Sequence, residues 1–236
     1  MKYNFKPTSA LELFGYKVYT ILVENFSQTF FVGGMVRDLL LKRRVRDIDI
    51  ATSADPEQVM AILNKHGIAY DPQYKKLGIV AIPFRKINLS VTTFRMDYYI
   101  NSRYPKVTFA TNIKKDALRR DFTVNSLYLS LKTNQILDFN KGLADIKSRR
   151  IKFIGDPKKR IQEDPLRIIR ALRFALVLDL KLEKNTKIAI KNNFQMIGQL
   201  TKTKIKKEVE KIKSLKQKNI LKKVINSPKL LDKYFK

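Results

Sequence analysis

A pair of glycines between an apolar run and a helix-like segment limits the possible folds of this chain more than any other feature. Thr29–Val32 has the composition of a short strand, Gly33 and Gly34 interrupt it, and residues 35–42 then favour a helix. Residues 46–51 alternate polar and apolar side chains, as a strand with one solvated face does. The order of strand, glycine turn, helix and strand predicts a small α/β domain.

Further elements are predicted around this unit. We expect a helix over 9–26 with Ser9 as its N-cap, and another from Asp55 to Lys65. Two apolar runs, Ile79–Ile82 and Ile87–Thr93, favour a hairpin added to the same sheet.

The second half of the chain has a more helical pattern. We expect helical structure from Asp116 onward, broken over 138–145, with a short strand at 151–154. Two amphipathic helices follow, over 165–178 and 204–224. These patterns place a domain boundary near residue 145, so that residues 1–145 and 146–236 form two parts.

The charge balance predicts a polyanionic partner. The 236 residues carry 49 Lys and Arg against 21 Asp and Glu, a net charge of +28. Release of counterions from phosphates favours association with nucleic acid, and an anionic membrane surface is the second candidate. Residues 181–236 are especially rich in lysine. An AT-rich genome also enriches lysine, so part of the excess has a compositional explanation.

Several classes of site are excluded by composition. The chain has no cysteine and one histidine, which rules out thiolate zinc sites, disulfides and imidazole clusters. A metal must therefore be held by oxygen ligands. No apolar run is long enough to cross a bilayer, and the first residues lack the pattern of a signal peptide, so a cytoplasmic location is expected.

Two carboxylates, Asp47 and Asp49, are the candidate metal ligands. Alternate residues of a strand project from one face, so both carboxylates converge where Mg²⁺ can be held. Gly33 and Gly34 allow backbone to approach a phosphate closely, and Arg37 adds positive charge. This combination outlines a nucleotidyl-transfer site. The alternative for the carboxylates alone is an ordinary solvated strand face.

Four motifs together resemble the family of class II tRNA nucleotidyltransferases and bacterial poly(A) polymerases. In family order, they are Gly33-Gly-Met-Val-Arg-Asp38 with Asp47-Ile-Asp49, then Arg119-Arg-Asp-Phe-Thr-Val-Asn125, then 138–145 with Gly142, and Glu163-Asp-Pro-Leu-Arg-Ile-Ile-Arg170. The third of these resembles the family's hinge, for which an ordinary turn glycine is the alternative. The resemblance implies a nucleotidyltransferase head of α/β (α+β) class with a mixed or antiparallel sheet, followed by a short all-α neck. It also implies template-independent addition of CMP or AMP, from CTP or ATP, to the 3′ end of tRNA with Mg²⁺.

The resemblance assigns roles to individual residues. Asp47 and Asp49 would be the catalytic metal ligands. The positions expected to bind nucleotide are Gly33, Gly34, Arg37, Arg119, Arg120, Asp121, Asn125, Asp164, Arg167 and Arg170. The positions expected to bind RNA are Lys202, Lys204, Lys206 and Lys207, for which a solvated helix face is the alternative.

The nucleotide-binding motifs also have a physical interpretation of their own. Arg119 and Arg120 offer paired donors for phosphate, and Asp121 accepts hydrogen bonds from ribose hydroxyls. Asp164, Arg167 and Arg170 follow one another at i, i+3 spacing and are expected to form one polar helix stripe that reads a base edge. Glu163 is expected to pair with Arg167 at i, i+4 spacing.

The chain departs from the family pattern in four places, of which the smallest is Ser126, where the family usually has alanine. Ser90 precedes Val-Thr-Thr-Phe-Arg where the family commonly has an acidic residue, so we assign no third carboxylate. The 70–78 stretch matches the family's flexible loop only loosely. The C-terminal region is shorter than the body and tail domains common in the family. A poly(A) polymerase acting on general RNA, a non-catalytic RNA-binding remnant and an enzyme that needs a partner chain therefore stay open.

Overall fold

The computed structural model describes residues 1–26, 28–85, 87–100 and 103–235. The chain forms two compact units, which are considered separately below. The first consists of Met1–Tyr98, Lys106–Arg120 and Val124–Leu143, and the second of Tyr99–Pro105, Asp121–Thr123 and Ala144–Lys236. The main division therefore falls two residues before the expected boundary, and two short upstream segments belong to the second unit. The assignment of 1–145 to a head and 146–236 to an RNA-binding region is a functional prediction.

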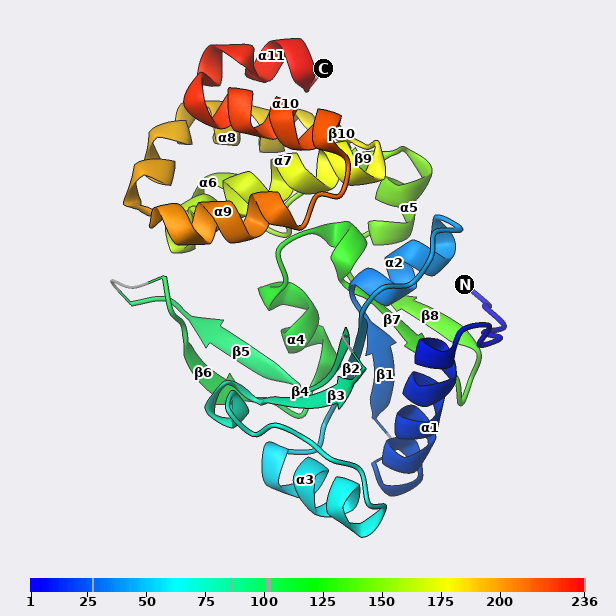
Figure 1. The fold of residues 1–236 in the computed structure, drawn as a ribbon. Coiled ribbons are helices and arrows are strands. Elements are labelled where there is room, and N and C mark those ends of the chain that lie inside the picture. The colour runs from blue at the N-terminus through cyan, green and yellow to red at the C-terminus, as the bar shows by residue number, and fades with distance from the viewer. Residues whose placement is uncertain (27, 86, 101–102, 236) are drawn as a thin grey trace. The chain divides into compact units, whose positions relative to one another are not determined.

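The first unit is built on a mixed sheet, which within the described residues has six strands in the order β3-β4-β2-β1-β7-β8 (Figure 1). The strands are β1 Thr29–Val32, β2 Ile48–Thr52, β3 Ile79–Phe84, β4 Ile87–Thr93, β7 Leu127–Ser130 and β8 Gln135–Asp138. Strands β2 and β4 run parallel, and the other neighbours are antiparallel. The predicted mixed α/β head is confirmed, as is the β3–β4 hairpin.

Helices α1 (Ala10–Asn25) and α3 (Pro56–Lys65) pack on this sheet. Both begin as predicted, because Ser9 and Asp55 each accept a hydrogen bond from the third helical residue in a capping box. Phe31, Ile48 and Ile50 are fully buried on the sheet, and Ile48 lies against α1 at Gly15. This face is the apolar core of the unit.

The opposite face carries the residues of chemical interest. Register pairs Val32 of β1 with Asp49 of β2 on one side and with Tyr128 of β7 on the other, and Asp49 with Ser90 of β4. Directly paired residues project to the same face of a sheet. Helix α4 (Ile113–Arg119) covers part of that face, where its buried Ala117 packs in a cluster with Val32 and Tyr128.

Several elements differ from the sequence-based expectations. The region after Asp116 is not continuously helical, because it contributes β7 and β8 to the main sheet after the single turn η2 (Thr123–Asn125). A hairpin of β5 (Arg95–Tyr98) and β6 (Lys106–Phe109) was not predicted. Strand β2 begins at Ile48, so Asp47 precedes it.

The glycine turn and the expected hinge are both ordered. Helix α2 covers Gly34–Leu40, with Gly33 as its N-cap. At the expected hinge, the Asp138 carboxylate accepts hydrogen bonds from the backbone N–H groups of Gly142 and Leu143, each at 2.9 Å. Helix α5 then begins at Gly142 and ends at Lys147.

The second unit is largely helical. Its helices are α6 Pro157–Glu163, α7 Leu166–Leu178, α8 Lys184–Asn192, α9 Lys202–Glu210, α10 Leu215–Asn226 and α11 Leu231–Tyr234, with the short turns η3 Phe194–Gln199 and η4 Pro228–Leu230. Helix α7 is its centre, since Ile168, Ile169 and Leu172 are fully buried. Strand β9 (Arg150–Ile151) overlaps the short strand expected at 151–154 but ends at Ile151. It pairs in parallel with β10 (Lys181–Leu182), which was not predicted, so the region is not all-α as the resemblance implied.

The single helix expected over 204–224 is wrong. It is divided into α9 and α10, because the Ser214 side chain accepts a hydrogen bond from the Gln217 N–H and caps a new helix. Of the apolar positions that give this segment its amphipathic pattern, Val209 and Ile212 are buried and Ile205 is half-buried, and Ile212 lies between the two helices. Among the described residues, no helix has both the length and the apolar character needed to cross a membrane.

Two left-handed glycines allow a test of local packing. Gly78 has φ of +73°, and a Cβ there would lie 2.9 Å from the Phe109 ring and 3.4 Å from Thr93 Cβ. Gly67 has φ of +63° with nothing within 4 Å of such a Cβ. We expect Gly67→Ala to lower the free energy of unfolding by about 1 kcal/mol, the cost of a left-handed alanine. We expect Gly78→Ala to lower it by about 2–3 kcal/mol, because its methyl group would also press against Phe109 and Thr93. Urea denaturation of both variants measures this, and equal losses would contradict the packing argument.

Candidate functional site

Residues from separate segments meet at the end of β1. A Cβ placed on Gly33 would lie 3.5 Å from Asp49 Oδ2, 3.6 Å from Arg120 Nη1 and 3.9 Å from the Asn125 carbonyl oxygen. Gly33 has φ of +74°, a conformation that favours glycine, and a side chain would fill the space between these groups. We call Gly33, Asp49, Arg120 and Asn125 the Gly33 corner. It brings together members of the first two predicted motifs.

The predicted metal ligands lie at the start of β2. Asp49 is half-buried, and its Oδ1 accepts a 2.6 Å hydrogen bond from Ser90 Oγ on the neighbouring strand β4. Asp47 is exposed and immediately precedes the strand. The described residues contain no group of three or more Asp, Glu, His or Cys able to hold a metal. Two carboxylates with an adjacent hydroxyl are nonetheless the hard oxygen donors that Mg²⁺ prefers, and Mg²⁺ sites commonly keep waters and substrate phosphates as further ligands. The residues present therefore fit this ion.

Arg37 connects the first two motifs. Its Nη1 donates to Asn125 Oδ1 at 2.5 Å, and its Nε donates to Asp38 Oδ1 at 2.9 Å. The side chain of Arg37 is buried, and its Nη2 lies 3.4 Å from the position of a Cβ on Gly34. The second glycine therefore leaves room for this arginine behind the turn.

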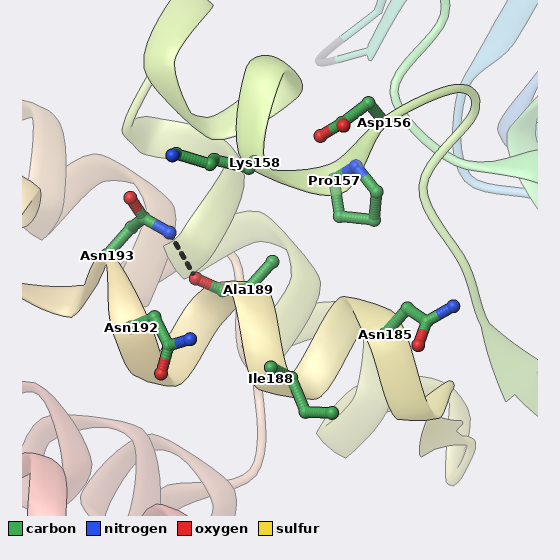
Figure 2. Close-up of a pocket in the computed structure, with 8 residues that line it drawn as sticks. All are labelled: Asp156, Pro157, Lys158, Asn185, Ile188, Ala189, Asn192 and Asn193. Atoms are coloured by element: carbon green, nitrogen blue, oxygen red, sulfur yellow. Dashed lines mark hydrogen bonds between the residues drawn. The ribbon is translucent and has the colours of Figure 1, made fainter.

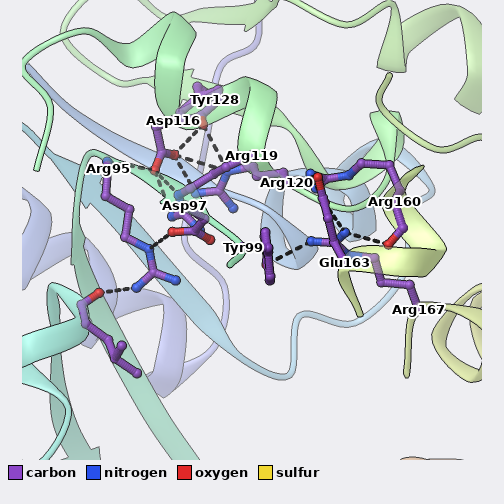
Figure 3. A network of polar contacts seen from close by, with 11 residues as sticks. Arg95, Asp97, Tyr99, Asp116, Arg119, Arg120, Tyr128, Arg160, Glu163 and Arg167 are labelled. Atoms are coloured by element: carbon purple, nitrogen blue, oxygen red, sulfur yellow. Dashed lines mark hydrogen bonds and ion pairs between the residues drawn. The ribbon is translucent and has the colours of Figure 1, made fainter. Parts of the chain in front are cut away.

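Arg119 and Arg120 are held by one buried carboxylate, that of Asp116 (Figure 3). Arg119 Nη2 lies 2.7 Å from Asp116 Oδ1, and Arg120 Nη2 lies 3.0 Å from Oδ2. The hydroxyl of Tyr128 donates to Oδ2 at 2.5 Å. Burial alone would raise the pKa of Asp116, but the charges of Arg120 and Arg119 and the Tyr128 hydrogen bond outweigh it and lower the pKa to about 2. Asp116 is therefore a carboxylate at neutral pH.

The sequence-based prediction missed Asp116, Tyr128 and Asp97. Asp116 stands three and four residues before the two arginines on a helix, which is the spacing of side chains in contact, so the signal was present. Asp97 lies 3.0 Å from Arg95 and 3.7 Å from Arg119. These contacts were not predicted, because Asp97 lies on the hairpin that the sequence analysis did not predict. No sequence pattern distinguishes the hydroxyl of Tyr128 from that of any other buried tyrosine.

In the second unit, Asp121 and Arg170 bind each other. Arg170 Nε and Nη2 donate to Asp121 Oδ2 at 2.9 Å and 2.5 Å. Asp121 Oδ1 accepts the Phe122 N–H at 2.8 Å, and Arg170 also lies 3.9 Å from Glu208. Arg170 thus orients the carboxylate that was predicted to contact ribose.

The predicted base-reading residues do not form one helix stripe. Asp164 precedes α7 as the C-cap of α6, whereas Arg167 lies within α7 and is buried. Helix α7 begins at Leu166 with Pro165 as its N-cap, and the Asp164 carboxylate, just before it, accepts the Leu166 N–H at 3.1 Å.

The predicted pairing of Glu163 with Arg167 is confirmed at 2.6 Å (Figure 3). Arg167 Nη2 also donates to the hydroxyl of Tyr99 at 2.9 Å, and Arg103 lies 3.0 Å from Asp164. Both side chains are therefore held in defined positions.

The predicted RNA-binding lysines lie on or beside the exposed face of α9. Lys202, Lys206 and Lys207 are exposed. Lys204 Nζ donates to the Tyr104 hydroxyl at 2.5 Å and lies 4.7 Å from the centre of the Tyr104 ring. This places an exposed aromatic ring against Lys204.

A separate pocket lies between α6 and α8 in the second unit (Figure 2). Its volume is about 400 Å³, and its polar lining includes Lys158, Asn185 and Asn193. Asn193 is tied to the Ala189 carbonyl at 2.8 Å. The pocket contains none of the predicted site residues.

The depressed pKa of Asp116 has a measurable consequence. A carboxylate with a lowered folded-state pKa adds stability above its unfolded pKa, and this stability is lost as the pH falls toward the folded value. We expect Asp116→Asn to cost about 3 kcal/mol of unfolding free energy near neutral pH, because the variant leaves two arginines without their carboxylate. The difference from wild type should shrink between about pH 4 and about pH 2. Denaturation across this range measures it, and a constant difference would contradict the assignment.

Comparison with known proteins agrees with this arrangement. The sequence profile described as "Poly A polymerase head domain" matches residues 29–152. The chain is similar to the CCA-adding enzyme of Lactobacillus helveticus, with 40% identity over 190 residues, covering 78% of this chain and 46% of the relative. It is similar to that of Streptococcus uberis at 38% identity, covering 78% and 45%.

Solved structures show the same fold. The Bacillus stearothermophilus CCA-adding enzyme in complex with CTP matches with a TM-score of 0.75 and 34% identity, covering 86% of this chain and 49% of that one. A tRNA nucleotidyltransferase complexed with a primer tRNA and an incoming ATP analogue matches with a TM-score of 0.72 and 25% identity, covering 91% and 61%. The chain spans about half the length of the curated relatives it matches. With its mixed head sheet, the Gly33 corner and the helical region that follows, the chain belongs to the family of class II CCA-adding enzymes and poly(A) polymerases that share this head domain.

Proposed function

We propose that this protein is a template-independent RNA nucleotidyltransferase that adds CMP, AMP or both to the 3′ end of tRNA in the cytoplasm, with Mg²⁺. The substrates would be CTP, ATP and a tRNA lacking part or all of its CCA end. The matched relatives are CCA-adding enzymes, and solved neighbours hold CTP or a primer tRNA with an ATP analogue, which supports these substrate classes.

The Gly33 corner is the observation that carries the proposal. It joins a turn without a side chain, a carboxylate and an arginine within one compact unit. A triphosphate with a bound cation needs this combination, because its charge must be met by donors and its metal by oxygen ligands. A solvated strand face, the alternative for Asp47 and Asp49, does not explain why Arg120 and Asn125 converge on the same turn.

The reaction assigned to this corner is attack of the RNA 3′-hydroxyl oxygen on the α-phosphorus of the nucleotide. A new phosphorus–oxygen bond forms, the bond to the β-phosphate bridge breaks, and pyrophosphate leaves. Asp47 and Asp49 would hold Mg²⁺, which supplies charge stabilisation for the attacking and leaving oxygens. Gly33, Gly34, Arg119 and Arg120 would bind the triphosphate, so that positioning and electrostatics provide most of the rate acceleration.

Residues of the second unit are assigned to the sugar and base. Asp121, oriented by Arg170, would accept a ribose hydroxyl. Asp164 and Arg167 would read the base edge, one accepting and the other donating. Their neighbours Arg103, Glu163 and Tyr99 restrict both side chains, which lowers the entropic cost of recognition. Arg37 and Asn125, which are hydrogen-bonded to each other, would support the Gly33–Gly34 turn that binds the triphosphate.

Incorporation on defined acceptors tests the proposal. The protein is incubated with Mg²⁺, labelled CTP or ATP, and tRNA transcripts that end before CCA, after CC or after CCA, beside a generic RNA. Extension of the incomplete tRNAs that stops at CCA is expected. Long A tails on generic RNA would identify a poly(A) polymerase, and RNA binding without incorporation would overturn the enzyme assignment. Weak activity that rises on addition of a partner chain would indicate an incomplete enzyme.

The metal ligands give the sharpest mutational test. We expect Asp49→Asn and Asp47→Asn each to reduce incorporation roughly 1,000-fold, since metal stabilisation is worth several kcal/mol and each tenfold corresponds to about 1.4 kcal/mol. Glu24→Gln is the matched control, because Glu24 is an exposed carboxylate of the same unit that lies outside all the matched motifs. Incorporation that survives both substitutions in folded protein would show that these carboxylates do not hold the catalytic metal.

The lysines of α9 give a test of RNA binding. We expect replacement of Lys202, Lys206 and Lys207 by Gln to weaken tRNA binding and to flatten the dependence of log K on log salt by about 2, the change for three lost phosphate contacts. Replacing the exposed Lys17, Lys65 and Lys132 of the first unit changes net charge equally and serves as control. Binding curves over a salt series measure both slopes, and equal changes would favour a merely solvated helix face.

A further inference from the structure

The side chain of Arg120 is bound by two residues outside the four sequence motifs, Asp116 and Tyr128. Its Nε lies 2.9 Å from the Tyr128 hydroxyl and 3.2 Å from Asp116 Oδ2, and its Nη2 lies 3.0 Å from the same carboxylate oxygen. The guanidinium carbon lies 5.2 Å from the centre of the Tyr128 ring. We call these two partners the Asp116–Tyr128 clamp.

The clamp is fully buried, and each of its hydrogen bonds has a defined donor and acceptor. Asp116 and Tyr128 both have 0% exposure. The Tyr128 hydroxyl donates its proton to Asp116 Oδ2 at 2.5 Å and accepts from Arg120 Nε. Burial raises the pKa of Tyr128 above its ordinary value, so the phenol keeps the proton that this arrangement needs. Arg119 binds the other oxygen of the Asp116 carboxylate, since its Nε donates to Oδ1 at 2.8 Å.

The clamp is anchored in the same sheet that forms the Gly33 corner. Tyr128 on β7 is paired in register with Val32, the residue immediately before Gly33. Arg120 Nη1 lies 3.6 Å from the Cβ position at Gly33, a point that is 3.5 Å from Asp49 Oδ2. Nε and Nη2 of Arg120 therefore face the clamp, whereas Nη1 lies near the turn at Gly33.

We propose that Asp116 and Tyr128 are positioning residues that fix Arg120 at the Gly33 turn for contact with the nucleotide triphosphate. This inference rests on the proposed function. An arginine side chain has large rotamer freedom, and holding it in place before binding reduces the entropy lost when the triphosphate arrives. Tyr128 acts through Arg120 and makes no contact with substrate of its own.

The experiment measures equilibrium binding of ATP and of CTP, with Mg²⁺ and without RNA, by calorimetry. Tyr128→Phe removes one hydroxyl and keeps the ring. We expect it to weaken binding of both nucleotides about 10-fold, the effect of one lost hydrogen bond to a charged group. The matched control is Tyr19→Phe, which removes a buried hydroxyl that accepts the Leu131 N–H at 3.0 Å in the same unit. It should leave nucleotide binding unchanged.

A double-mutant cycle separates positioning from general loosening of the fold. Arg120→Lys keeps the charge but cannot bond to the clamp and reach the turn at once. We expect it to weaken binding by at least as much as Tyr128→Phe, and we expect Tyr128→Phe to have no further effect in the Arg120→Lys background. Additive losses would overturn the clamp, as would equal losses in Tyr128→Phe and Tyr19→Phe.

The outcomes also distinguish the clamp from the proposed function. If the folded wild-type protein binds neither nucleotide, the proposed function fails and the clamp has no triphosphate to serve. If wild type binds nucleotide but the cycle is additive, only the clamp is overturned. Thermal unfolding of each variant, followed by circular dichroism, shows whether a loss of binding is accompanied by a loss of fold.

Discussion

The register of β1 between β2 and β7 is the constraint on which the candidate site depends. Val32 is paired with Asp49 on one side and with Tyr128 on the other, so the residue after it enters the turn between a carboxylate and a phenol. A shift of one residue would turn every side chain of the strand to the opposite face. The buried Phe31 prevents this, because its ring would then leave the apolar face covered by α1.

Positive charge is organised in two ways in this protein. The arginines of the candidate site lie against carboxylates that fix their direction in both units, as Asp116 does for Arg120 and Asp121 does for Arg170. Arginine suits this task because its planar guanidinium offers several donors at fixed angles. On α9 of the second unit the positive charge is carried by lysine on solvated helix surface. Such charge attracts a polyanion without specifying its geometry. The two kinds of charge therefore match different parts of the proposed reaction.

Much of the fold could be predicted from the sequence, for reasons visible in particular residues. The caps Ser9 and Asp55, the glycine pair and the alternation around Asp49 are local signals, and the elements they predict are present. Strand β7 was missed because all four of its residues are buried, and a short run without alternation has no period that separates strand from helix.

The candidate site was predictable to a similar degree. Its motif residues were identified by kind and order. The contact between Glu163 and Arg167 was predicted from i, i+4 spacing, although Glu163 ends α6 and Arg167 lies in α7. The position of Asp164 outside α7 was not predicted, because a sequence pattern does not fix the exact residue at which a helix begins. Asp116 and Tyr128 required the tertiary structure, since the hydroxyl reaches the carboxylate across the boundary between a sheet and a helix.

The division of the chain also affects how the two units unfold. Phe122, in the short 121–123 segment, stacks on Phe153 at 4.9 Å between ring centres and meets Phe174 edge-on at 5.7 Å. The residues on both sides of this segment belong to the first unit, so the chain passes from the first unit to the second and back again here. A fragment ending at Leu143 would expose the Phe122 ring to water and would lose the partners of that segment. A single cut at Leu143 therefore does not divide the chain into its two units, because two segments of the second unit, Tyr99–Pro105 and Asp121–Thr123, lie before it.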